Sequence, residues 1–191
     1  QETAKEYRAA GVTALLGPQV DIASPIMSRA GGTYGEDPQL TLDIATAYVN
    51  GMQSTYDENG EDLGWGNESV YCFTKHFAGA GATEGGRDDH GNGGRYAVFP
   101  GNNLEAHLIT YFDGVFNLPG KTGSSGIMTE YAIDVDADGN PYGGEWAGAY
   151  NPYLNGMLDE AGFDGLKITD WSVFTFAGVW GAEDLEEADR V

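Results

Sequence analysis

The sequence predicts an α/β fold in which parallel strands form a sheet or a barrel. Short apolar runs of strand type alternate with longer segments of helical periodicity. A polar or glycine-rich loop follows the predicted strands, an arrangement typical of parallel strands joined by helices. The chain has about four such strands, whereas a complete barrel needs eight. We therefore expect an incomplete (β/α)8 barrel.

Helices are predicted where apolar residues recur at a spacing near 3.6 and where glycine or proline marks an end. In the second helix this spacing relates Leu40, Ile44, Tyr48 and Met52. Gly11 stops the first helix and Gly162 caps the fourth. The predicted helices span residues 2–10, 40–52, 104–116 (one helix or a pair), 152–160 and the acidic run 183–190.

The predicted strands are short and consist mainly of buried-type residues. They span residues 12–16, 69–73, 126–129 and 166–169. Long polar segments separate these elements, and we expect loops over residues 54–68, 79–101 and 134–149. The 30 glycines of the chain favour many tight turns over long helices.

Composition excludes several classes of partner. The net charge is −21, with only nine Lys and Arg, which argues against nucleic acid and against anionic membrane surfaces. No apolar stretch is long enough to span a membrane. The acidic balance is compatible with a secreted or periplasmic protein. Cys72 is the single cysteine, so the chain cannot form an internal disulfide.

Asp170 is the first candidate for chemistry. It directly follows the strand predicted over residues 166–169 and directly precedes Trp171. Catalytic groups of α/β barrels lie at the carboxyl ends of strands, and a carboxylate beside a flat ring suits an enzyme that acts on a sugar. The alternative is a helix N-cap, a common role for aspartate after a strand.

A possible calcium loop lies between residues 134 and 145. Asp134, Asp136, Asp138, Gly139 and Glu145 have the spacing of a twelve-residue calcium-binding loop. The preceding element is a predicted strand instead of a helix, and an acidic surface loop is the alternative. If the chain needed calcium to fold, we would interpret it as an unrelated α/β metal protein.

Four motifs occur in a fixed order along the chain. They are Arg29 followed by Gly-Glu-Asp-Pro (35–38), Lys75-His76-Phe77-x-Gly79-x-Gly81, Met128-x-x-Tyr131, and Gly-Phe-Asp-Gly-x-x-x-x-Asp-Trp (162–171). Together they resemble the N-terminal barrel of glycoside hydrolase family 3, which contains β-glucosidases and β-N-acetylglucosaminidases. The resemblance implies that residues 1–191 form part of a (β/α)8 catalytic domain, without the C-terminal α/β sandwich domain of the family.

The resemblance also implies roles for individual residues. Asp170 matches the covalent nucleophile, and Trp171 matches the aromatic residue that flanks the sugar. Positions that hold sugar hydroxyls or orient the nucleophile correspond to Arg29, Lys75, His76 and Tyr131. The implied activity is retaining hydrolysis of terminal, non-reducing β-D-glucosyl residues, with no cofactor required. Such enzymes use two carboxyl groups about 5–5.5 Å apart, one nucleophilic and one acidic.

The source of the acid is the main departure from the family pattern. In most members the second domain supplies a glutamate, so the chain alone is expected to be a poor enzyme. The hexosaminidase branch uses an Asp-x-His pair after its Lys-His-Phe motif, and Asp88-x-His90 has this local pattern. The alternatives to a β-glucosidase are therefore a β-N-acetylglucosaminidase and a non-catalytic carbohydrate-binding fragment.

Overall fold

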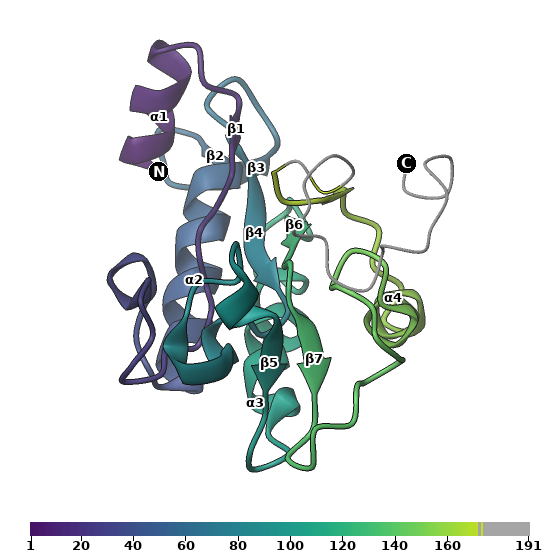
Figure 1. Ribbon diagram of the computed structural model, residues 1–191. Coiled ribbons are helices and arrows are strands. Elements are labelled where there is room, and N and C mark those ends of the chain that lie inside the picture. The colour runs from purple at the N-terminus through teal and green to yellow at the C-terminus, as the bar shows by residue number, and fades with distance from the viewer. Residues whose placement is uncertain (172, 174–191) are drawn as a thin grey trace.

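The centre of the computed structural model, which describes residues 1–171 and 173, is a parallel sheet (Figure 1). The sheet contains β1 (Ala14–Leu15), β4 (Tyr71–Phe77), β6 (Gly126–Thr129) and β8 (Lys167–Ile168). The strands lie side by side in chain order, and every neighbouring pair is parallel. The sheet thus confirms the predicted α/β fold and its four parallel strands, and it is an open sheet instead of a closed barrel within the described residues.

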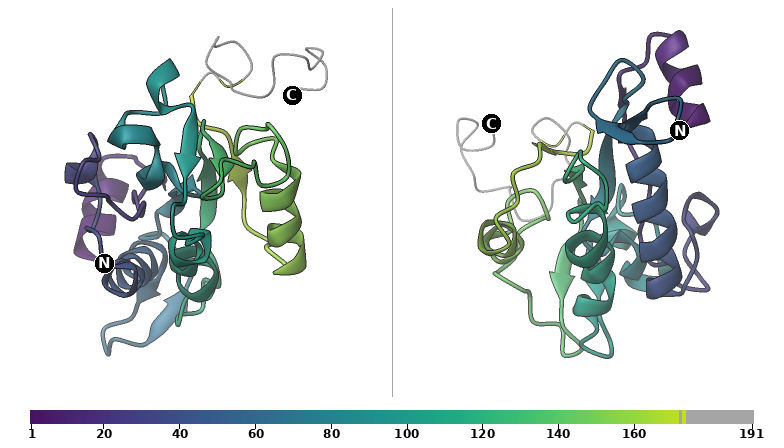
Figure 2. Two further views of the ribbon diagram at one scale, coloured as in Figure 1. Left: turned by 60° about the horizontal axis from the view of Figure 1, so that its bottom comes forward. Right: turned by 180° about the vertical axis from the view of Figure 1, so that it is seen from behind.

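One helix precedes β1, and the others lie between successive strands of the sheet, as parallel pairing requires. They are α1 (Glu2–Ala9), α2 (Pro38–Gln53), α3 (Leu104–Ile109) and α4 (Pro152–Glu160), and α3 continues into a π-helix, η5 (Thr110–Val115). The four corresponding predictions are confirmed to within a few residues, while the helix predicted over 183–190 lies outside the described residues. Figures 1 and 2 show α1 and α2 on one side of the molecule and α4 on the opposite side.

Three segments predicted as loops contain strands. In the first, β2 (Thr55–Tyr56) pairs antiparallel with β3 (Asp62–Gly64). The other two supply β5 (Tyr96–Val98) and β7 (Ile133–Val135), which pair in parallel across more than thirty residues of chain. Strands of two or three residues are too short for a visible alternation of apolar and polar positions, so the prediction of plain loops was wrong there. Single 3-10 turns span Ala30–Gly32, Ala80–Ala82, Glu84–Gly86 and Asn92–Gly94.

The main core lies between α2, the α3–η5 helix and the sheet. Val49 and Met52 of α2, Phe77 of β4 and Ile127 of β6 are fully buried together. The Phe77 ring packs edge-on against Tyr111 of η5, with the ring centroids 5.0 Å apart. This core fixes the ends of β4 and β6 against a rigid helical layer. None of the described helices is both long and apolar enough to cross a membrane.

Asn151 joins α4 to the rest of the fold. Its Oδ1 accepts the backbone N–H groups of Tyr153 (2.9 Å) and Leu154 (3.2 Å), and its Nδ2 donates to the carbonyl of Tyr142. The side chain is therefore an N-cap that also holds the preceding loop, and the residue is fully buried.

Replacing this cap tests its importance for stability. We expect Asn151→Ala to cost about 1–2 kcal/mol, because two helix N–H groups and a carbonyl lose their partner. In a domain of this size the melting temperature should fall by roughly 2–8 °C. Asp37→Ala, which removes the exposed cap of α2, is the matched control and should cost less. Equal losses in the two variants in thermal unfolding would contradict the special role of Asn151.

Candidate active site

Residues from all four parallel strands meet at one edge of the sheet. Asp21 lies shortly after β1, His76 lies near the end of β4, Tyr131 follows β6 and Asp170 follows β8. The Nε2 atom of His76 is 3.4 Å from Oδ2 of Asp170, and its Nδ1 atom is 2.9 Å from Oδ2 of Asp21. The carboxyl ends of parallel strands lie at the same edge, which is why residues so far apart in sequence come together.

Asp170 combines partial burial with access. Its side chain is 14% exposed, and its Oδ1 accepts the backbone N–H of Trp171 at 2.6 Å. The adjacent Trp171 is 81% exposed, so its ring is free to contact a ligand. The Tyr131 hydroxyl donates to the carbonyl of Trp171. Burial, followed by the negative charge of Asp170, raises the pKa of Tyr131, so this hydroxyl keeps its proton at neutral pH.

The structure places Arg29 near this group, and it places the backbone of Lys75 beside it. Lys75 immediately precedes His76 on β4, and its backbone bonds to the chain after β1 through Pro18 and Val20. Arg29 lines the same small cavity as His76, together with Asp88 and Asp89. The Arg29 Nε atom lies 3.9 Å from Oδ2 of Asp88. The structure therefore gathers the predicted residues Arg29, His76, Tyr131, Asp170 and Trp171 at one site, and Lys75 is placed beside it by its backbone.

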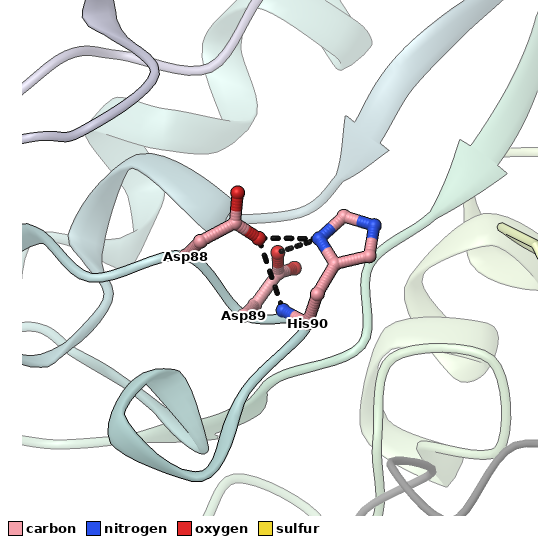
Figure 3. Close-up of side chains that lie close together, drawn as sticks. All are labelled: Asp88, Asp89 and His90. Atoms are coloured by element: carbon pink, nitrogen blue, oxygen red, sulfur yellow. Dashed lines mark hydrogen bonds and ion pairs between the residues drawn. The ribbon is translucent and has the colours of Figure 1, made fainter.

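Asp88, Asp89 and His90 form a compact cluster (Figure 3). The His90 Nδ1 atom bonds to Oδ1 of Asp88 and lies 3.5 Å from Oδ1 of Asp89. The ring packs edge-on against Tyr131, with the centroids 4.7 Å apart. The bond to Asp89 and then the pairing with Asp88 outweigh partial burial and raise the pKa of His90 to about 9. The ring is therefore protonated at neutral pH.

That cluster has the residue types of a metal site. Its ligand atoms lie within 4.8 Å of one another, and the described residues contain no other group of three such side chains. Both carboxylates lie against the same ring nitrogen, Nδ1 of His90, and we interpret the cluster as an ion-paired acid.

The residues of the predicted calcium loop have separate partners. Asp134 belongs to β7 and is buried, whereas Asp136 accepts the backbone N–H groups of Asp138 and Asn140 in an exposed turn. Glu145 contacts Tyr96 and Arg95. The structure brings no three of Asp134, Asp136, Asp138 and Glu145 together as ligands. Calcium binding stays a prediction. Thermal unfolding with and without millimolar calcium tests it.

Sequence reasoning missed three buried acids at this edge of the sheet: Asp21, Asp89 and Glu130. Two of them have a signal that is visible in hindsight. Asp21 lies between Val20 and Ile22 directly after a strand, and Glu130 directly continues the apolar strand that ends at Thr129. A charged residue inside an apolar run is uncommon unless it has a buried partner.

Glu130 and Asp134 are such partners. Both residues are almost completely buried, and none of their four carboxylate oxygens has a conventional donor. Burial, followed by the charges of Asp134 and Asp89, raises the pKa of Glu130 well above its ordinary value. Burial likewise raises the pKa of Asp134, while the bond from Glu130 partly opposes that shift. Glu130 therefore keeps a proton and donates it to Asp134.

The profile of the glycosyl hydrolase family 3 N-terminal domain matches residues 1–190. The chain is 36% identical over 202 residues to "Probable beta-glucosidase C" of Aspergillus oryzae and 37% identical over 208 residues to "Periplasmic beta-glucosidase/beta-xylosidase" of Dickeya chrysanthemi. These alignments cover 99% and 97% of this chain. The chain spans only 29% and 30% of the length of these two relatives.

Solved structures give the same relationship. The β-glucosidase EmGH1 of Erythrobacter marinus superposes with a TM-score of 0.66 at 28% identity, over 88% of this chain and 20% of that chain. The β-glucosidase of Listeria innocua also superposes with a TM-score of 0.66, at 26% identity, over 90% of this chain and 21% of that chain.

The buried acid pair yields a prediction about stability. A carboxyl group whose folded-state pKa is raised contributes stability below its unfolded pKa, about 4.3 for glutamate. That contribution is lost as pH rises toward the folded-state value. We therefore expect Glu130→Gln, which keeps a donor for Asp134, to melt above the parent at pH 7, with the difference shrinking toward pH 4. Glu58→Gln in an exposed loop is the control and should change little. A lower melting temperature of Glu130→Gln at pH 7 would refute the protonated pair.

Proposed function

The chain belongs to glycosyl hydrolase family 3. On that premise we propose that it carries the nucleophile and several of the sugar-binding residues of a retaining β-glycosidase. The observation that supports this proposal is the position of Asp170, which lies at the tip of β8 between His76 and the exposed ring of Trp171. Terminal, non-reducing β-D-glucosyl residues are the proposed substrate. In support, both curated relatives are named β-glucosidases, and a Listeria innocua β-glucosidase variant was solved with laminaribiose.

The proposed reaction begins with attack of the Asp170 carboxylate on the anomeric carbon. This attack forms a glycosyl-enzyme ester and expels the aglycone, and water then hydrolyses the ester with overall retention. Lys75 and Arg29 are the proposed partners of the sugar hydroxyls. His76 holds an oxygen of the sugar or of Asp170, and the Trp171 ring contacts the apolar face of the sugar.

A second proposal concerns the proton donor. His90 is protonated at neutral pH, is oriented by Asp88, and packs on Tyr131 beside the proposed nucleophile. These features suit a general acid, and an Asp-His acid is the arrangement of the β-N-acetylglucosaminidase alternative. We propose His90 as a proton donor within this chain, in place of a glutamate from another domain.

The proposed location is outside the cytoplasm, either secreted or periplasmic. The net charge of −21 suits a soluble protein exposed to salt. The Dickeya chrysanthemi relative is described as periplasmic, which supports the same assignment. Proposed partners are β-linked glucosides and oligosaccharides, and the charge disfavours nucleic acid.

Trapping of the intermediate tests the nucleophile. The protein that contains this chain is treated with a 2-deoxy-2-fluoro β-glucoside, and we expect mass spectrometry to find the label on Asp170. Asp170→Asn should lose nearly all turnover. Asp164→Asn is the control, because Asp164 precedes β8 at the opposite end of the strand and, among the described residues, its side chain bonds only to Ser124. A label on another carboxylate, or an inverted product, would refute the proposal. Sugar binding without any hydrolysis of an aryl glucoside would identify a binding fragment.

A comparison of leaving groups tests the acid. We expect His90→Gln and Asp88→Asn to lower kcat/KM by about 10²–10⁴-fold on cellobiose, which needs protonation of its leaving group. Activity on a dinitrophenyl glucoside, which needs none, should be nearly unchanged. In the parent, activity on cellobiose should fall as the pH rises through about 9, because His90 then loses its proton. Equal losses on both substrates would assign the acid elsewhere.

A further inference from the structure

Asp21 belongs to none of the four sequence motifs, yet it makes the most extensive contacts with His76. Its Oδ1 accepts the backbone N–H of His76 at 3.1 Å, and its Oδ2 lies 2.9 Å from the ring Nδ1. Oδ2 also accepts the Gln19 amide N–H at 2.8 Å. The Asp21 side chain has no exposed surface, and that of His76 is only 2% exposed. The contacts between the Asp21 carboxylate and His76 are therefore shielded from water.

The charge of Asp21 determines which ring nitrogen carries the proton. Burial alone would raise the pKa of Asp21, but the charge and hydrogen bonds of His76 and the bond from Gln19 lower it. Asp21 is thus ionised at neutral pH and can only accept hydrogen bonds. Because Nδ1 of His76 faces an acceptor that cannot donate, Nδ1 must carry a proton.

We propose that Asp21 is a positioning residue that fixes the Nδ1–H tautomer of His76 and thereby directs Nε2 toward Asp170. Nε2 is the ring atom 3.4 Å from Oδ2 of Asp170. In the neutral ring it accepts a hydrogen bond from a sugar hydroxyl, and in the protonated ring it donates a hydrogen bond to the Asp170 carboxylate. His76 of β4 thereby connects Asp21, which follows β1, to Asp170, which follows β8. The inference rests on the proposed role of Asp170 only where catalysis is concerned.

The contacts of Asp21 predict what an amide would do in its place. In Asp21→Asn, Oδ1 can still accept the backbone N–H of His76, which is buried and costly to leave unpaired. The new NH2 group then faces Nδ1 of the ring. Two donors cannot face each other, so the ring should move its proton to Nε2, as happens when the aspartate of a Ser-His-Asp triad is replaced by asparagine.

Nitrogen NMR of the 191-residue chain tests this tautomer directly. The chain has three histidines, so ring signals of the 15N-labelled protein can be assigned by single replacements. At a pH where the His76 ring is neutral, we expect the parent to carry its proton on Nδ1 and Asp21→Asn to carry it on Nε2. Asp134→Asn removes another buried carboxyl group that has no contact with His76 and should keep the parent tautomer.

The results separate this inference from the proposed function. A parent ring protonated on Nε2 would overturn the role of Asp21, even if Asp21→Asn fails to fold. Given the tautomer change, labelling of Asp170 by the fluoro glycoside should slow on the order of 10²-fold in Asp21→Asn, because a reacting group is misplaced. Unchanged labelling of Asp170 in that variant would also overturn the inference. A label on another carboxylate would refute the nucleophile while leaving the tautomer result intact.

Discussion

Parallel pairing of four strands in chain order is the constraint on which the site depends. Each strand of β1-β4-β6-β8 runs the same way, so the chain leaves all four at one edge. Asp21, His76, Tyr131 and Asp170 follow or end these strands, although they are separated by up to 149 positions of sequence. A slip of one residue in the pairing would turn side chains to the other face of the sheet. The buried contacts of Phe77 and Ile127 with the helical layer help to hold this register.

The acidic composition creates an electrostatic problem at this edge. Asp21, Asp89, Glu130 and Asp134 are all buried near it, and the chain has only nine Lys and Arg. Two solutions coexist. Asp21 and Asp89 stay beside histidine rings that can carry positive charge, whereas Glu130 retains a proton and shares it with Asp134. Histidine rings and a protonated glutamate are thus the partners of these buried acids, in place of lysine and arginine.

Much of the secondary structure could be predicted from local pattern. The helix α2 has a regular apolar spacing, an aspartate cap and a proline at its start, and these signals need no tertiary information. The pair β5 and β7 had no such signal. Tyr96–Val98 and Ile133–Val135 become strands because each supplies the other with backbone partners. Partners so distant in sequence leave no mark on local periodicity.

For the site, the sequence by itself determined the identity of the chemical groups: an aspartate at a strand tip beside a tryptophan, a Lys-His pair and a tyrosine after another strand. Residue type and position relative to a strand end are local properties, so they could be recognised in order along the chain. Only the tertiary structure decided which groups touch. It paired His76 with Asp21 and His90 with Asp89, buried Asp134 against Glu130, and separated Asp134 from Asp136 and Asp138. Such pairings depend on how distant strands and loops pack in three dimensions, because hydrogen bonds and charge interactions act over distances in space that sequence separation does not specify.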